Sequence, residues 1–177
     1  MPRSLADGHV RWTILTEKPA DPANPTEAEL TGPNAIYMSQ NVLASDFLWG
    51  FADSDKVQEK PLSETSNANA IGASNPQGRC TVFRYFDPET KNGDPVEDEP
   101  FQTLKTKGTT LYGYARETAK LSAEEWEEGD EIYLGAEFVT DEPAPPSSRG
   151  GFIKYTVPLE LQYTYPHTEV ASSGSSG

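Results

Sequence analysis

Two long stretches in which apolar and polar residues alternate constrain the fold of this chain most. They cover residues 130–140 and 152–163. The apolar positions are Ile132, Leu134, Ala136 and Phe138 in the first stretch and Ile153, Tyr155, Val157, Leu159 and Leu161 in the second. Because successive side chains of a strand point to opposite faces, every second residue lies on one face. The pattern therefore predicts two half-buried β-strands.

Proline residues modify this prediction in two places. Pro158 lies inside the second stretch and cannot donate a hydrogen bond to a neighbouring strand, so we expect an edge strand or a bulge there. The connecting segment 141–151, DEPAPPSSRGG, is too long for a tight turn. Its composition predicts a stiff, Pro-rich loop that ends in a flexible Gly150–Gly151 hinge.

The rest of the chain supports a mainly β fold. Further strands are predicted over residues 10–17, 79–86 and 109–117, and polar turn-rich segments separate them. Residues 37–62 are ambiguous, and with a strand there the tally is about six. With 177 residues, one hydrophobic core is feasible without disulfides. The economical fold is an antiparallel β-sandwich or partly closed barrel with one flanking α-helix and long loops.

Two capping patterns predict short helices. Asn24, Pro25 and Glu27 indicate a helix of barely two turns, and Asp94, Pro95 and Glu97 repeat the pattern before the more convincing helix. Its buried stripe is expected to consist of Val96, Phe101 and Leu104. Pro100 falls inside this helix and should shorten or kink it.

Charge and cysteine content restrict the partners and the compartment. Asp and Glu number 28 against 14 Lys and Arg, which gives a net charge of −14. Such a surface repels nucleic acid and anionic membranes, because non-specific DNA binding needs clustered cations. Cys80 is the only cysteine and excludes an intrachain disulfide, which favours a reducing cytoplasm. We expect no membrane association, since no stretch approaches the roughly 20 apolar residues of a membrane span.

No group of residues indicates catalysis, a cofactor or a metal. His9 and His167 lie near opposite ends of the chain without a spaced third ligand. Carboxylates are so abundant that some pair always suggests a hydrolase, and no constellation supports one. We therefore predict no enzymatic activity, no catalytic residue, no cofactor and no metal site.

The apolar segment FLWGF, residues 47–51, is unusual because three large apolar side chains beside a glycine seldom face water. They enter the core or bury against another subunit. The candidate inter-subunit contacts are Phe47, Leu48, Trp49, Phe51, Pro143, Pro145, Pro146, Phe152 and Tyr155. We expect Trp49→Asp to block assembly while leaving a folded monomer. As an alternative, Trp12, Trp49 and Trp126 stack on sugars in a glycan-binding β-sandwich displayed on a virion or cell surface.

Several segments in order over about residues 1–160 carry a family resemblance. They include KVQEKPL, NANAIGASNPQG, FRYFDPETKNGD, LKTKGTTLY, EEWEEGDEIYL and FVTDEPAPPSSRGGFIKYTVPL. The chain resembles the major tail protein, or tail tube subunit, of long non-contractile-tailed bacteriophages, particularly those of actinobacteria. The resemblance implies one tail tube domain over 1–165, with an N-terminal arm at 1–9, a long hairpin or stacking loop at 41–66 and a flexible C-terminal tail at 166–177.

The function that the resemblance implies is structural. Six copies close into a ring, and the rings stack into a tube through which the genome passes during ejection. The implied partners are the tape measure protein and the tail terminator and tip proteins, and the protein is made in the host cytoplasm and resides in the virion tail. A bore rich in Asp and Glu would let double-stranded DNA pass without binding it.

Overall fold

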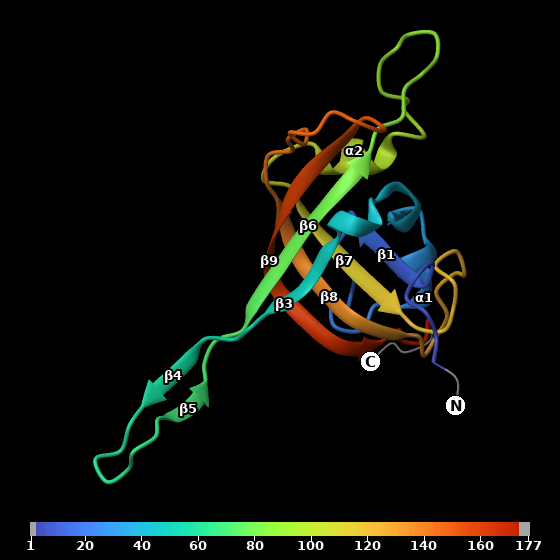
Figure 1. Cartoon of the computed structure of the whole chain (residues 1–177). Coiled ribbons are helices and arrows are strands. Elements are labelled where there is room, and N and C mark those ends of the chain that lie inside the picture. The colour runs from blue at the N-terminus through green and yellow to red at the C-terminus, as the bar shows by residue number, and fades with distance from the viewer. Residues whose placement is uncertain (1–2, 174–177) are drawn as a thin grey trace.

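A seven-stranded antiparallel sheet dominates the protein (Figure 1). The computed structural model describes residues 3–173. The sheet has the strand order β2-β1-β7-β8-β9-β6-β3, and β4 and β5 form a separate hairpin. The strands are β1 (Val10–Leu15), β2 (Ala35–Tyr37), β3 (Leu48–Ala52), β4 (Lys56–Glu59), β5 (Ala68–Ile71), β6 (Asn75–Phe83), β7 (Thr110–Glu117), β8 (Glu131–Thr140) and β9 (Lys154–Glu169). The helices are α1 (Glu27–Thr31), α2 (Glu99–Leu104) and the 3-10 turns η1 (Ser39–Asn41) and η2 (Ala44–Asp46).

The sheet curls until its two ends meet around one core. The Met38 N–H donates to the Trp12 carbonyl of β1, and the Leu43 N–H donates to the Thr81 carbonyl of β6, each at 2.9 Å. Trp49 of edge strand β3 lies with its ring 5.4 Å from that of Trp12. The mainly antiparallel β class is confirmed, as a strongly curled sheet and not as a closed barrel.

Alternating residues of the long strands fill this core. Leu134, Ala136 and Phe138 of β8 face Val157 and Leu159 of β9, and all five are buried as their spacing predicts. Cys80 and Trp12 are also buried in this core. Burial raises the pKa of the Cys80 thiol, so it stays protonated.

The expected consequence of Pro158 is wrong. Strand β9 lies inside the sheet, between β8 and β6, and not at an edge. The Pro158 carbonyl accepts from the Asp141 N–H at 3.0 Å, so the missing proline N–H faces the point where β8 has just ended. The bulge occurs four residues later, where Glu137 pairs with Tyr163 but Phe138 pairs with Leu161.

Strand β9 also runs beyond the predicted end, and residues 166–169 of the expected tail belong to it. Residues 174–177 of that tail lie outside the described residues.

Both helices begin later than the capping patterns predict. Thr26, not Asn24, caps α1, and its hydroxyl and the Glu29 carboxylate form the capping box. The Asp94 carboxylate accepts from the Val96 and Glu97 N–H groups, both at 2.8 Å, which makes a turn and not a helix start. Helix α2 starts at Glu99 because Pro100 is tolerated only in a first turn.

The predicted buried stripe of α2 is therefore partly corrected. Phe101 and Leu104 are buried as expected. Val96 precedes the helix and is 73% exposed, since the turn at Asp94 directs this part of the chain into solvent.

We expect Trp49→Ala to lower the free energy of unfolding by about 3–5 kcal/mol, because Trp49 is a core residue. Its indole is 5% exposed, packs edge-on against Phe138 and donates to the Leu134 carbonyl at 3.0 Å. Urea unfolding measures the change, with Phe51→Ala, at a side chain 44% exposed, as the control. Equal losses in the two variants would contradict this role. Trp49→Asp should accordingly unfold the monomer, which revises the expectation from the sequence.

Candidate assembly surfaces

The β4–β5 hairpin projects away from the body of the protein (Figure 1). It pairs Lys56 with Ile71 and Glu59 with Ala68, overlaps the expected 41–66 segment and extends beyond it. Every residue of its two strands is exposed. Val57 is 52% exposed, Ile71 85%, and Leu62 at the tip is fully exposed. A two-stranded hairpin is marginally stable alone in water, and the apolar side chains of this arm are uncovered within the described residues.

A second surface lies on the outward face of β7, β8 and β9. Tyr112, Glu137 and Tyr163 stand directly opposite one another, and Val139 stands opposite Glu160. Burial raises the pKa of Tyr112, and the Glu137 carboxylate raises it further. Neither β8 nor the part of β9 after Lys154 contains Lys or Arg. This face combines tyrosines with carboxylates and carries no cation on these two strands.

The Pro-rich loop forms a third surface where β8 ends and β9 begins. A shallow groove is lined there by Pro145, Pro146, Arg149, Phe152 and Lys154, among others. Phe152 is 81% exposed and Ile153 59%, and the Phe152 ring lies edge-on to Phe83 at 6.2 Å. The Lys154 ammonium donates to the Gly150 and Phe152 carbonyls at 3.1 and 3.3 Å, which fixes the glycine turn.

The candidate contact residues from the sequence divide into three groups. Trp49 is buried in the core and is not accessible to another subunit, whereas Phe47 and Tyr155 are half-buried against that core. Leu48 and Phe51 are exposed on the edge strand β3. The remaining group lies in or beside the groove: Pro143, Pro145, Pro146 and Phe152.

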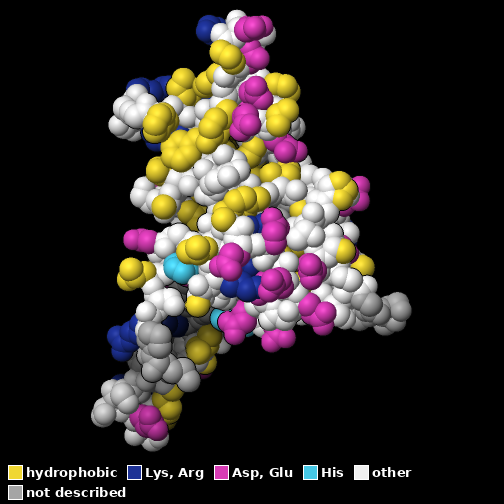
Figure 2. All heavy atoms as spheres, turned by 90° about the vertical axis from the view of Figure 1, so that its right-hand side faces the viewer, with side chains coloured by type: hydrophobic (Ala, Val, Ile, Leu, Met, Phe, Trp, Pro, Cys, Tyr) yellow, Lys and Arg dark blue, Asp and Glu magenta, His cyan; other side chains and the backbone are white. Residues whose placement is uncertain are grey.

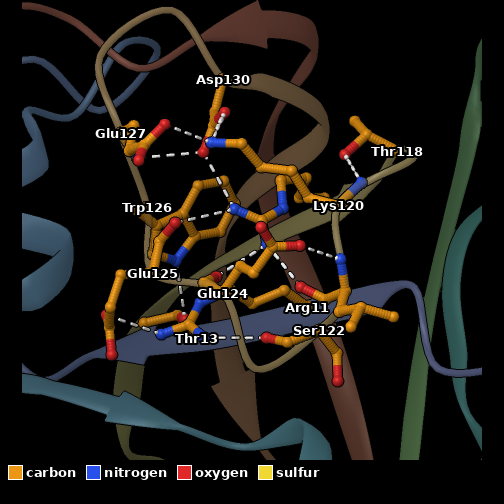
Figure 3. A network of polar contacts seen from close by, with 12 residues as sticks. Arg11, Thr13, Thr118, Lys120, Ser122, Glu124, Glu125, Trp126, Glu127 and Asp130 are labelled. Atoms are coloured by element: carbon orange, nitrogen blue, oxygen red, sulfur yellow. Dashed lines mark hydrogen bonds and ion pairs between the residues drawn. The ribbon is translucent and has the colours of Figure 1, made fainter.

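Sequence reasoning missed a pair of buried arginines behind the acidic run 124–130. Arg11 of β1 and Arg116 of β7 stand directly opposite each other and are 3% and 0% exposed. Arg116 donates to the carbonyls of Leu121, Glu124 and Glu125 at 3.0, 2.8 and 3.1 Å, and to the Asp130 carboxylate at 2.9 Å. Arg11 donates to the Ser122 carbonyl at 2.8 Å and to Glu125 at 3.0 Å (Figure 3).

Carboxylates and an indole complete this network. Lys120 contacts Glu127 and Asp130, each at 2.7 Å. Burial alone would raise the pKa of Asp130, but hydrogen bonds from Lys120 and the Glu127 N–H, with the nearby Arg116 charge, hold it below its usual range. Trp126 donates to Thr13 at 2.9 Å and lies against the Arg116 guanidinium. Part of the acidic run is therefore internal counter-charge and not free surface charge.

A signal for this network was present in the sequence. Arg11 and Arg116 lie inside two predicted strands, on the face opposite to Trp12 and Ala115, where the loop 121–130 covers them and an unpaired charge is costly. An acidic run follows Arg116 within a few residues, and that proximity indicates pairing.

Other site classes find little support within residues 3–173. No three His, Cys, Asp or Glu side chains there are arranged to hold a metal ion. The glycan-binding alternative requires exposed tryptophans that stack on sugars. The three tryptophans are buried: Trp12, Trp49 and Trp126. Among the described helices none is long and apolar enough to cross a membrane.

We expect acid to destabilise the protein partly through Asp130. Its folded pKa is depressed, so its stabilising effect is present above the unfolded pKa, about 3.9, and is lost as pH falls through the folded pKa. Asp130→Asn should flatten the fall of unfolding free energy below that pH, measured by urea titration at several pH values. The exposed Glu128→Gln is the control, and an unchanged slope in Asp130→Asn would contradict the assignment.

Comparison with known proteins identifies the family of the chain. No curated protein matches the chain. The sequence profile of one family, described as phage tail tube protein, matches residues 1–174 and thus nearly the whole chain. The resemblance seen in the sequence segments is confirmed at the level of the family. The chain therefore belongs to the phage tail tube protein family, whose members are structural components of the virion tail that assemble into its tube.

Proposed function

We propose that six copies of this protein close into a ring, that the rings stack into the tail tube, and that the tube conducts the genome during ejection. The number of six copies per ring is taken from the family that the sequence resembles. The role is structural and non-enzymatic, and the tape measure, terminator and tip proteins are its partners. The protein is made in the host cytoplasm before it joins the virion.

The observation that carries this proposal is the projecting β4–β5 hairpin. Its apolar side chains Val57, Leu62 and Ile71 have no cover in the monomer. Its base is anchored to β6, where the Asn75 amide donates to the Asp53 carbonyl at 2.9 Å and to the Asp55 carboxylate at 3.1 Å. An anchored arm with an exposed apolar surface suits a bridge between successive rings.

Edge strands offer the contacts within a ring. Strands β2 and β3 are the two edges of the curled sheet, and β3 exposes Leu48 and Phe51. An uncovered edge pairs readily with another chain, which is a hazard for a monomer and a means of assembly for a ring.

The outward face of β7–β9 is our assignment for the wall of the bore. Glu137 and Glu160 lie on it, and β8 and β9 after Lys154 provide no cation. Non-specific affinity for DNA comes from Lys and Arg that displace counterions from the phosphates. A wall without such side chains repels DNA and lets it slide.

Electron microscopy of the purified protein tests the assembly. We expect rings and tubes at high concentration or after addition of a nucleating tail protein. A protein that stays a monodisperse monomer under both conditions would refute the proposal.

The arm provides a sharper prediction. The triple variant Val57→Ser, Leu62→Ser and Ile71→Ser should still fold, because all three side chains lie outside the core, but it should form few or no stacked tubes. Thermal unfolding checks the fold and electron microscopy counts the tubes. Leu5→Ser with Leu121→Ser changes exposed side chains elsewhere and is the control. Tubes of ordinary length from the triple variant would exclude the arm as the bridge.

The bore assignment predicts a gain of DNA binding. Tubes of Glu137→Lys with Glu160→Lys should retain DNA at low salt and release it as salt rises, because two lysines per copy then face the phosphates. Sedimentation of tubes with labelled DNA measures this. Glu17→Lys with Glu128→Lys makes the same charge change on exposed positions away from this face. Equal DNA retention by both variants would show that the face does not line the bore.

A further inference from the structure

The two ends of strands β8 and β9 differ in charge and in apolar exposure. At one end, where β8 stops and β9 starts, Asp141 and Glu142 directly follow β8 and Asp141 pairs with Lys107, whereas the groove segment 143–159 contains Arg149 and Lys154 and no acid. At the other end, where β7 stops, β8 starts and β9 stops, a pocket of about 240 Å³ is lined by Glu117, Glu131 and Glu169. The chain has twice as many acidic as basic residues, yet Arg149 and Lys154 lie at one end of these strands and the three glutamates lie at the other.

The groove at this end is apolar and contains two cations that form no ion pair within the described residues. Neither Arg149 nor Lys154 forms an ion pair within residues 3–173. Phe152 and Ile153 beside them are among the most exposed apolar side chains of the body. Burying such side chains against a protein stabilises a contact by roughly 25 cal/mol per Å² of apolar area.

The acidic end has carboxylates that also lack partners. Glu131 and Glu169 are directly opposite on β8 and β9, and like charges in that position repel. Neither they nor Glu117 form an ion pair among the described residues. The pocket wall also contains Thr168, whose hydroxyl is buried and has no hydrogen-bond partner among the described residues. His167, Ile132 and Tyr133 complete the lining.

We propose that the groove at residues 145–155 of one copy binds the Glu117–Glu131–Glu169 pocket of a second copy, end to end along β8 and β9. Arg149 and Lys154 supply the cations that the three glutamates lack, and Phe152 and Ile153 become buried. The proposal rests on the tube assembly described above and specifies which surfaces of successive copies meet.

The position of the two surfaces allows this contact to repeat. Strand β8 has ten residues, which at about 3.3 Å per residue separates its ends by roughly 30 Å. Figure 1 shows the loop between β8 and β9 at one end of the molecule and the end of β9 at the other. Because the surfaces differ and lie at opposite ends, each copy can bind one neighbour at each end, which produces an extended stack.

The side view shows how charge is distributed over one face of the molecule. In Figure 2 many Asp and Glu side chains lie across the middle of this face, and further Asp and Glu side chains lie among the hydrophobic ones above them. The β4–β5 arm leaves the body beside the start of β6, while the groove lies at the opposite end, where Phe83 pairs with Lys154. The arm and the acidic pocket are thus both directed toward the same neighbour.

Zero-length carbodiimide cross-linking of tubes made from the unaltered protein tests the proposal. The reagent joins an amine to a carboxylate in direct contact, and we expect a Lys154 cross-link to Glu131 or Glu169 in the peptide mass spectrum. Within one copy these residues lie at opposite ends of the strands, so this product arises only between copies. Tubes in which Lys154 is cross-linked only to other carboxylates, or to none, would overturn the proposal.

Charge reversal gives an independent test. Arg149→Glu with Lys154→Glu, or Glu131→Lys with Glu169→Lys, should each abolish most pelletable tube, and the four changes together should restore it. Lys18→Glu with Lys105→Glu reverses two exposed cations outside the groove and should assemble normally. The pairing is refuted if the reversed pairs assemble as well as the control, or if the combined variant remains as defective as either pair.

Different results would contradict the proposed function and this pairing of surfaces. If the unaltered protein never forms tubes, the proposed function itself is refuted. If tubes form but neither the cross-link nor the charge rescue appears, the tube stands and only this pairing of surfaces is wrong.

Discussion

The guanidinium of Arg116 lies under the loop that connects β7 to β8, and four hydrogen bonds attach that loop to it. Three go to backbone carbonyls and one to the Asp130 carboxylate. Because Arg11 lies directly opposite with its own bonds to Ser122 and Glu125, the loop is held from two strands at once. The cost of burying two like charges makes these partners obligatory. Burial lowers the pKa of Arg11, and the Glu125 carboxylate opposes that shift.

This interaction has consequences beyond the loop. It fixes where β7 ends and where β8 begins, and therefore where Glu117 and Glu131 stand relative to the end of β9. It also seats Trp126, which covers Leu15, Ile132 and Val170 on the outer side of the sheet. The second, smaller core of the protein thus depends on the same guanidinium that organises the acidic run.

The alternation of apolar and polar residues predicted those strands that have one buried face. The alternating runs gave β1, β7, β8 and β9 because one face of each is buried, and that pattern is local. The interior position of Pro158 was not predictable in this way, because it depends on where the neighbouring strand ends. Asn24 and Asp94 fit the sequence rule for helix caps, but their side chains bind other backbone groups. The Asn24 side-chain oxygen accepts from the Glu169 N–H, and the Asp94 carboxylate accepts from the Val96 N–H in a turn. Burial of Trp49 required the sheet to curl, which no local pattern reveals. The arm has no periodic signal at all, since neither of its faces is covered.

The excess of acid has three separate physical roles in this protein. Glu125, Glu127 and Asp130 pair with buried or half-buried cations. The Asp130 side chain is 10% exposed, whereas those of Glu125 and Glu127 are 70% exposed and also face the solvent. Glu137 and Glu160 stand on an open face where β8 and the part of β9 after Lys154 carry no cation, and we propose that they repel phosphate there. Glu117, Glu131 and Glu169 crowd together without a partner, which destabilises the monomer slightly and favours any neighbour that brings a cation. Net charge alone does not distinguish these roles, because burial and pairing decide which carboxylates act on the solvent. The monomer leaves an apolar hairpin, an apolar groove and an unpaired acidic pocket uncovered, and burial of such surfaces favours assembly. The surfaces that lower the stability of the isolated chain are therefore the ones that we propose as its contacts in the tube.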